Sequence, residues 1–574
     1  MVTRSESGRL LLAAGVLVAA FAAVAGIDDA HRAAADRVRT YVYNTDGCDM
    51  LYYPTNDHIN VDAFIGQRLG FARDTKISTV SYCPLSSGFG YFTVLGVGDP
   101  LTNSEIVATG YGASRRNATL PFARIGHDCL EMAMSFCRDR GFERFMSIRM
   151  NDSHDGASRP HKGKFDLLFS PFRRRHPEFL MGDPAKDEWP EQCAWQWTCV
   201  DYSHAEVRDY VRKFVRDFCE KYDMEGIEFD FCRHPKYFKR CSYGETATDA
   251  ERALMTELVC DLRKIAQEYE AKKGHPILLN ARVPDSVEYC RDIGLDLKAW
   301  LEAGALDGII GGCYFNLNDW KVMADFVHGY GAKFYASIDE SRIPGSCRRW
   351  NRPMIPGRDT VENYCASYAQ AMKAGADGIY LFNLEHDSLV ARTQFDPRDT
   401  DGRDKIYFAT QRGKGGYEPI HYLKDGYRYK NLPYIDPATD PKTVLKDQSG
   451  LHDPGLDVAV QYAVDKRRTF ELRLGDDFAA AAAKGRTPTI TVMALTTGLT
   501  SAKEAAFTLN GVDLKGFSCN KGCAATSAKF ENGLITYENV APAIVKCGIN
   551  VFTVEPADGK PFVLNDFAVK IEYK

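Results

Sequence analysis

The chain has 574 residues, of which 45% are hydrophobic and 26% charged, a composition that excludes a fibrous or disordered protein. This length exceeds what a single hydrophobic core usually organises, so at least two domains are expected. The formal net charge of -5 offers no electrostatic footprint for nucleic acid or an anionic membrane, and it excludes nucleic acid as a partner.

Residues 1–25 have the order of a secretory signal peptide. Arg4 and Arg9 precede an apolar run over residues 10–25, which ends in small residues. This order predicts cleavage near Ala25 and a secreted or periplasmic protein. The run is shorter than the ~20 residues that a membrane span needs, so no stable span is expected after cleavage. An uncleaved N-terminal membrane anchor is the alternative.

Residues 38–395 alternate short apolar runs of strand type with longer helical patterns. This alternation predicts βα units and a parallel sheet. The eight candidate strands are residues 40–44, 77–82, 145–150, 226–231, 277–282, 308–314, 333–338 and 378–382. Eight units of this kind predict a (β/α)₈ TIM barrel. Residues 84–124 and 151–202 lack helical periodicity, and we expect them to form loops over the active-site face.

A second domain follows a connector. Residues 396–450 are rich in Asp, Pro, Gly, Lys and Tyr and are expected to link the barrel to residues 451–574. The second segment contains strand-type runs at residues 456–462, 469–474, 489–495, 506–509, 535–538, 549–554 and 563–573. Many short strands with turns between them predict an all-β sandwich. Because this segment has no inward acidic cluster, we expect it to supply no catalytic group.

Two local features give further expectations. The pattern of residues 203–222 predicts a helix whose N-cap is Ser203, with Glu206 completing a capping box. Four cysteines lie in apolar, strand-like runs and are expected as buried thiols, namely Cys48, Cys83, Cys232 and Cys313. The candidate disulfides, chosen by closeness in sequence, are Cys193 with Cys199 and Cys519 with Cys523.

Strand alternation selects the side chains that face the barrel interior. Three apolar residues alternate with Glu228 and Asp230 in the strand at residues 226–231, so the two carboxylates are expected to point inward. The same alternation predicts further inward residues at C-terminal strand ends, where the active sites of this fold lie. They are Asn44, Asp46, Arg149, Asn151, Asn280, Arg282 and Asp339.

Glycosidic bond cleavage fits this arrangement. The reaction needs one carboxyl group to protonate the leaving oxygen and a second to act as nucleophile or to activate water. The candidate catalytic residues are Asp230 and Glu228 on the fourth strand, with Asp339 and Glu340 at the end of the seventh. No cofactor or metal is needed for this chemistry. The expected partner is a carbohydrate, and inward arginines extend the range to acidic and sulfated sugars.

The other polar and aromatic residues at the same face are candidates for substrate binding. They are Asp46, Arg149, Asn151, Asp152, His154, Arg233, His234, Asn280, Arg282, Tyr314, Trp350 and Glu385. Trp197, which lies in a predicted loop like Trp350, is expected either to stack on sugar or to pin the loop to the core.

Three alternatives stay open. Glu228, Arg149 and Arg282 can form a buried salt-bridge network that only supports the barrel mouth. The whole barrel can be a non-catalytic carbohydrate-binding or cell-surface protein. A metal-dependent hydrolase would use Asp152, His154 and Asp155, but this choice is disfavoured because other strands supply no clear set of histidine ligands.

The fourth-strand sequence Gly226-Ile227-Glu228-Phe229-Asp230-Phe231, followed by Arg233-His234-Pro235, resembles a family signature. The family is glycosyl hydrolase-like family ten, a group of bacterial barrel proteins. The strand ends at residues 147–152 and 378–383 are similar to that group as well. The resemblance implies a TIM-barrel glycoside hydrolase with Asp230 as acid/base and Asp339 or Glu340 as nucleophile. The best-known pattern of the wider clan ends this strand in Asn-Glu, where this chain has Asp230-Phe231-Cys232.

Overall fold

The fold is known from a computed structural model. It describes residues 29–45, 49–50, 53, 59–87, 89–91, 99–100, 118–153, 155, 169–188, 190, 194–243, 245–312, 319–339, 361–382, 405–409, 462–499, 501–515, 517–521 and 532–574. Two compact units divide the chain, namely Met1–Gly311 with Phe326–Tyr335, and Gly312–Asp325 with Ala336–Lys574.

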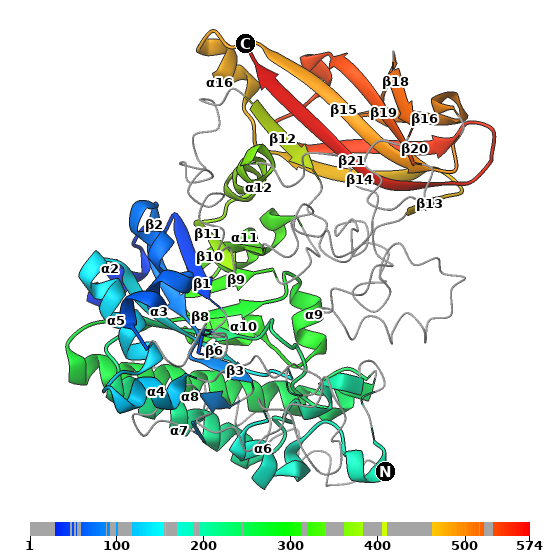
Figure 1. The fold of residues 1–574 in the computed structure, drawn as a ribbon. Helices are drawn as coiled ribbons and strands as arrows, with labels where there is room; N and C mark the ends of the chain where they lie inside the picture. Colours follow the sequence, from blue (N-terminus) through cyan, green and yellow to red (C-terminus); the bar gives the residue numbers. More distant parts are fainter. Residues whose placement is uncertain are drawn as a thin grey trace. The chain divides into compact units, whose positions relative to one another are not determined.

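Eight strands of the described chain form a closed barrel in the order β1-β11-β10-β9-β8-β7-β6-β2 (Figure 1). They are β1 (Tyr41–Thr45), β2 (Ile77–Tyr82), β6 (Glu143–Arg149), β7 (Gly226–Asp230), β8 (Leu278–Val283), β9 (Gly308–Gly311), β10 (Lys333–Asp339) and β11 (Gly378–Phe382). Neighbours from β1 through β2, β6, β7 and β8 to β9 are parallel. The TIM barrel is confirmed, and β2 and β11 have the predicted bounds.

Helices alternate with these strands along the chain. They include α3 (Val61–Arg68), α5 (Cys129–Arg140), α7 (Ala205–Lys221), α8 (Asp249–Lys273), α9 (Val287–Asp292), α10 (Leu297–Glu302), α11 (Trp320–His328) and α12 (Val361–Lys373). The long helices α7 and α8 lie side by side (Figure 1), and Arg212 of α7 donates to Asp261 of α8 at 3.0 Å. The insertions between strands carry α4 (Thr119–Arg124), α6 (Pro171–Arg175) and the sheet of β3 (Leu85–Ser87), β4 (Gly90–Tyr91) and β5 (Asp99–Pro100).

The predicted start of α7 is wrong. The helix begins at Ala205 after His204, and no side chain caps its first turn. The N–H of Ser203 instead donates to Asp201 at 2.9 Å, which places Ser203 in the turn before the helix. A capping box occurs at α8, where Thr248 and Glu251 each accept the other's N–H. The apolar side chains on one face of α7 are buried, namely Val207, Val211, Phe214, Val215 and Phe218.

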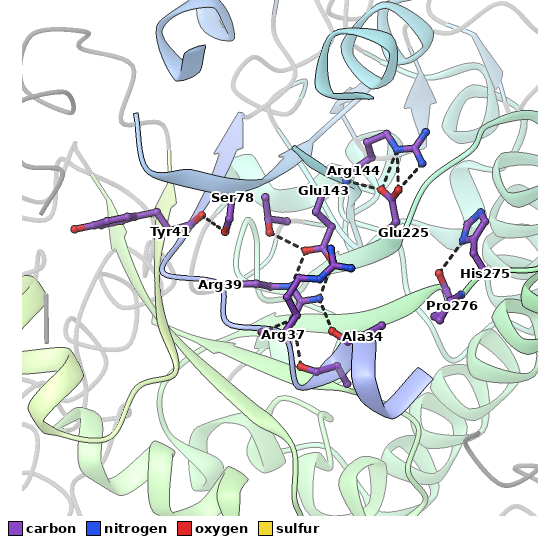
Figure 2. Close-up of polar contacts among 12 residues, drawn as sticks. Ala34, Arg37, Arg39, Tyr41, Ser78, Glu143, Arg144, Glu225, His275 and Pro276 are labelled. Carbon is purple, nitrogen blue, oxygen red and sulfur yellow. Dashed lines mark hydrogen bonds and ion pairs between the residues drawn. The ribbon is translucent and has the colours of Figure 1, made fainter. Parts of the chain in front are cut away.

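Ion pairs link neighbouring chain segments at the N-terminal ends of the barrel strands (Figure 2). Glu143, the first residue of β6, accepts from Arg39 at 2.6 Å through both oxygens and from Thr79 Oγ1 at 2.8 Å. Arg144 binds the Glu225 carboxylate, with Nε 2.9 Å from Oε2. Glu143 and Arg39 are both buried. At this end of a TIM barrel such residues contribute to stability.

The C-terminal strands form two sheets. One has the order β12-β21-β15-β19-β18 with β13 also paired to β21, and the other has the order β14-β20-β16-β17. The strands are β12 (Lys405–Ala409), β13 (Tyr462–Val464), β14 (Arg468–Leu474), β15 (Pro488–Thr497), β16 (Ala505–Leu509), β17 (Val512–Asp513), β18 (Phe517–Lys521), β19 (Asn532–Val540), β20 (Gly548–Pro556) and β21 (Phe562–Tyr573). Phe552 of β20 stacks on Phe567 of β21 with ring centroids 4.7 Å apart. Because this contact joins the two sheets, the predicted sandwich is confirmed.

The sandwich contacts other parts of its own compact unit. Arg473 of β14 donates through Nε to Asp319 at 2.7 Å, and its carbonyl accepts from Gln370 of α12 at 2.5 Å. A side-chain carbon at Gly475 would lie 2.6 Å from the backbone of Ala369, so the close approach to α12 requires glycine. The expected connector at residues 396–450 contributes β12, which pairs antiparallel with β21.

Buried thiols are found at Cys83 and Cys232, as predicted, and the other two predicted positions, Cys48 and Cys313, lie outside the described residues. Cys199 is a buried thiol as well, so the expected disulfide with Cys193 is wrong. The carbonyl of Cys199 accepts from the N–H of Met181 at 2.8 Å, and this pairing holds its segment in the interior. The other expected disulfide involves Cys523, which lies outside the described residues. Among the described helices, none is both long and apolar enough to cross a membrane.

Candidate active site at the C-terminal ends of the barrel strands

Two rows of side chains cross three neighbouring strands at the predicted active-site end. Strand register places one residue each from β6, β7 and β8 opposite one another in each row. Residues two apart on a strand face the same side, so both rows point the same way. The lower row is Ser147, Glu228 and Asn280, and the upper row is Arg149, Asp230 and Arg282.

Glu228 shows that both rows face the barrel interior. Its Oε2 accepts from Ser81 of β2 at 2.6 Å, and its Oε1 accepts from Ser147 of β6 at 2.8 Å. Asn44 of β1 donates to Oε1 at 3.3 Å. Because β1 and β2 do not neighbour β7 in the sheet, these bonds run through the interior, and the predicted parity is correct. Glu228 is fully buried and ties four strands together, which fits a supporting role.

Asp230 in the upper row is held by its own loop and by one arginine. Its Oδ1 accepts from the N–H groups of Cys232 at 2.8 Å and Arg233 at 3.1 Å. Its Oδ2 accepts from Arg282 at 3.3 Å. All three partners are donors, which suits an ionised carboxylate. The turn after β7 therefore fixes the orientation of Asp230, and the longest of the three bonds is the one to Oδ2.

Asn280 of the lower row occupies space that a glycine provides. Gly308 of β9 is its register partner, and a side-chain carbon at that glycine would lie 2.7 Å from Asn280 Oδ1. Asn280 is buried. This residue therefore lies below the upper row as part of the packed interior.

Asn151, predicted to bind substrate, joins two loops. Its Oδ1 accepts from the N–H of Val200 at 3.1 Å. Its Nδ2 donates to the carbonyls of Val200 at 2.9 Å and Lys236 at 2.6 Å. The side chain is fully buried, and its amide is used by the backbone. It holds together the segments that follow β6 and β7.

Asp152 and Asp155 are each bound by an arginine. Arg149 donates to Asp152 at 2.7 Å, and Arg173 donates to both oxygens of Asp155 at 2.8 and 2.7 Å. Thr198 adds a bond to Asp155 at 2.7 Å. Burial raises the pKa of Asp155 to about 6, and Arg173 and Thr198 only partly offset it. Carboxylates bound in this way are poor metal ligands, which argues against the metal-dependent alternative.

His234 is buried beside Asp152. Its Nδ1 accepts from the N–H of Ser153 at 2.8 Å, so this nitrogen carries no proton. The Oδ1 of Asp152 lies 3.7 Å from the same nitrogen. His234 thus contributes to the packing of the loops after β6 and β7.

Trp197 pins its loop to the core. It is buried and stacks on Phe169 with ring centroids 5.8 Å apart. A side-chain carbon at Gly182 would lie 2.6 Å from Trp197 Cβ, which reflects the tight fit. Of the two roles expected for this tryptophan, the structure supports the pin.

The remaining predicted site residues are described only in part or not at all. Asp339 ends β10, and only its backbone is described. Arg233 is partly exposed and supplies the N–H that Asp230 accepts. The residues outside the described ranges are Asp46, His154, Tyr314, Glu340, Trp350 and Glu385.

Sequence reasoning missed the partners that hold these groups. Ser81 and Ser147 lie on the inward parity of their strands, so alternation could have identified them as donors to Glu228. Arg173 gave no such signal, because it lies in α6 within a stretch expected from the sequence to be a loop, and it meets Asp155 only after folding.

No protein-family model matches the sequence, and no curated protein matches it. Similar solved structures include the galactosidase domain of the α-galactosidase-sucrose kinase AgaSK, at 13% identity, 88% coverage of this chain, 54% of that chain and a TM-score of 0.33. A doubly substituted GH36 α-galactosidase AgaA from Geobacillus stearothermophilus, in complex with raffinose, matches at 11% identity, 88% and 56% coverage and a TM-score of 0.31. A GH18 chitinase from Cycas revoluta matches at 12% identity, 63% and 100% coverage and a TM-score of 0.33.

The chain spans about half the length of the two α-galactosidase chains that it matches. All three similar structures are of glycoside hydrolases. The fold of this chain rests on its own strand pairing.

Proposed function

We propose that the protein cleaves glycosidic bonds at the C-terminal end of the barrel, with Asp230 as one of two catalytic carboxylates. The observation that carries this proposal is the setting of Asp230. It is a buried carboxylate at the C-terminal end of β7, oriented by two backbone N–H groups and Arg282. Buried charge is costly unless it is paired or used, and fixed orientation is what catalysis requires.

The donors around Asp230 favour a particular role. A carboxylate that accepts three hydrogen bonds is suited to attack the anomeric carbon or to stabilise positive charge on the sugar ring. The proton for the leaving oxygen would then come from Asp339, which ends β10, or from Glu340, the next residue in the sequence. The family resemblance implies the reverse assignment, with Asp230 as the acid. The two assignments predict different products in the presence of an added nucleophile.

The first test is a pair of variants assayed on a panel of polysaccharides and oligosaccharides that includes uronic and sulfated ones. Asp230→Asn keeps the side-chain shape and removes the charge, so kcat should fall by ~10²-fold to 10⁴-fold while the fold persists. Glu228→Gln is the matched control on the same strand. It disturbs the bonds to Ser81, Ser147 and Asn44, so it should lower stability more and rate less. Near-normal turnover by Asp230→Asn would exclude the proposed role.

The second test assigns the role of Asp230. In Asp230→Gly, azide can enter the vacated space and attack the anomeric carbon while the leaving oxygen takes its proton from the acid residue. If Asp230 is the nucleophile of a retaining enzyme, the product is a glycosyl azide of inverted anomeric configuration. If Asp230 is the acid/base, azide instead reacts with the glycosyl-enzyme and the configuration is retained. A barrel that only binds carbohydrate would bind a panel sugar with no turnover in any variant.

A further inference from the structure

Charged side chains of alternating sign form a series that leads from the loop after β6 to Arg149 of the upper row. Arg173 binds the carboxylate of Asp155 and also donates to the carbonyl of Asp152. The carboxylate of Asp152 then binds Arg149 at 2.7 Å. Arg149 is the register partner of Asp230, which accepts from Arg282.

Arg149 therefore lies where it could reach Asp230. The two residues are partners on adjacent parallel strands, about 4.8 Å apart in such sheets, and the N–H of Met150 donates to the Asp230 carbonyl at 3.0 Å. Both side chains point inward. The Arg149 guanidinium is nevertheless directed toward Asp152.

We propose that Asp152 is a positioning residue, which binds the Arg149 guanidinium and so keeps a second arginine off Asp230. This inference rests on the proposed function of Asp230 for its catalytic consequence. A second guanidinium on Asp230 would draw charge from the carboxylate and weaken it as a nucleophile. Asp152 thus sets how much positive charge Asp230 meets.

The surroundings of Asp152 make it fit for this task. It is fully buried, and Arg173 holds its backbone while Asp155 holds Arg173. His234 faces it with an unprotonated Nδ1 at 3.7 Å, so the histidine adds no positive charge there.

Several groups of the described residues face Asp230. They are Arg282 on β8 and the N–H groups of Cys232 and Arg233 after β7. Tyr237 is also near, and burial raises the pKa of its phenol well above the usual value, so it stays neutral. Arg149 on β6 completes the set.

A double-mutant cycle on the full chain tests the inference without a substrate. Thermal unfolding is measured for Asp152→Asn, Asp230→Asn and the double variant. In Asp152→Asn the Arg149 guanidinium loses the Asp152 carboxylate and can turn to Asp230, so removing Asp230 should then cost more. The loss of midpoint temperature in the double variant should exceed the sum of the losses in the two single variants by about 2 °C or more.

The matched control is Glu225→Gln, which disturbs a carboxylate-arginine pair at the opposite end of the same two strands. Glu225 precedes Asp230 by five residues, about 16 Å along a strand. Its cycle with Asp230→Asn should be additive. Additive behaviour in both cycles would overturn the inference. If Asp152→Asn does not fold, Arg149→Met replaces it. Its cycle with Asp230→Asn should be additive, because Asp230 accepts from Arg282 and not from Arg149 in the parent, and a non-additive cycle would then overturn the inference.

A pH profile separates positioning from simple support. On a substrate that the parent cleaves, Asp152→Asn should move the acidic limb of kcat/KM to lower pH by about one unit, because a second guanidinium favours the ionised Asp230. The plateau rate should fall, and Glu225→Gln should leave the limb in place. An unmoved limb in Asp152→Asn would contradict the inference. If the parent cleaves no sugar, the proposed function fails, and the unfolding cycle alone decides the role of Asp152.

Discussion

At the N-terminal ends of the barrel strands, Glu143 accepts short hydrogen bonds from Arg39 and Thr79, which come from other segments. At the C-terminal ends, Asp230 accepts from two N–H groups of its own loop and, at 3.3 Å, from Arg282. The first arrangement joins chain segments, as Figure 2 shows. The second orients one carboxylate. Buried charge thus serves stability at one end of the barrel and orientation at the other.

The largest effect on stability is expected at Glu143. Glu143→Ala removes the carboxylate that binds Arg39 and leaves the buried guanidinium without it. Breaking such a pair should lower the free energy of unfolding by about 3–5 kcal/mol. Urea unfolding followed by circular dichroism measures this loss, and the specific activity of the folded fraction should not change. A loss of activity with unchanged stability would reverse the roles of the two ends.

The next largest effect on stability is expected at His31, which lies on α2 (Asp29–Ala35). Its imidazole binds two carboxylates at the same end of the barrel. Its Nε2 lies 2.7 Å from Asp307 and its Nδ1 2.9 Å from Glu270. Burial lowers the pKa of His31, and Arg263 lowers it further, but the bonds to Asp307 and Glu270 outweigh both and raise it from 6.5 to about 9.

The sign of the pH effect follows from this raised pKa. Because the folded state holds the proton more tightly, the stabilisation is fully present below pH 6.5 and is lost as pH rises through about 9. It is on the order of 3 kcal/mol. Urea unfolding of the parent between pH 6 and 10 should show this decline, and His31→Asn should lack it. Equal slopes for the two proteins would show that His31 is neutral in the fold.

The smallest effect on stability is expected at Gly308, which packs against the lower row between the two ends of the barrel. In Gly308→Ala the added carbon would lie 2.7 Å from Asn280 Oδ1 and 3.2 Å from the carbonyl of Lys333. The lower row must shift, at a cost of about 1 kcal/mol or somewhat more in unfolding free energy. Gly66→Ala in α3 is the control, since an added carbon meets nothing within 4 Å there, and it should stabilise slightly. Equal effects of the two changes would mean that the lower row is loosely packed.

The sequence was sufficient for the fold class and for the direction of the strand side chains. Apolar runs alternating with helical patterns predicted the barrel, and all eight predicted strands overlap observed ones. The inward direction of Glu228 and Asp230 followed from the alternation of side chains on a strand, which is a property of the local backbone.

The partners of these side chains were decided by the tertiary structure. Ser81 and Glu228 are 147 residues apart in sequence and 2.6 Å apart in space, and Asn151 meets the backbone of Val200 and Lys236 rather than the barrel interior. Strand order and register decide which distant residues meet, and no local pattern contains that information. The sequence therefore determined where charge is buried in this barrel. Only the tertiary structure decided which charged groups support the fold and that Asp230 is the carboxylate oriented at the C-terminal end.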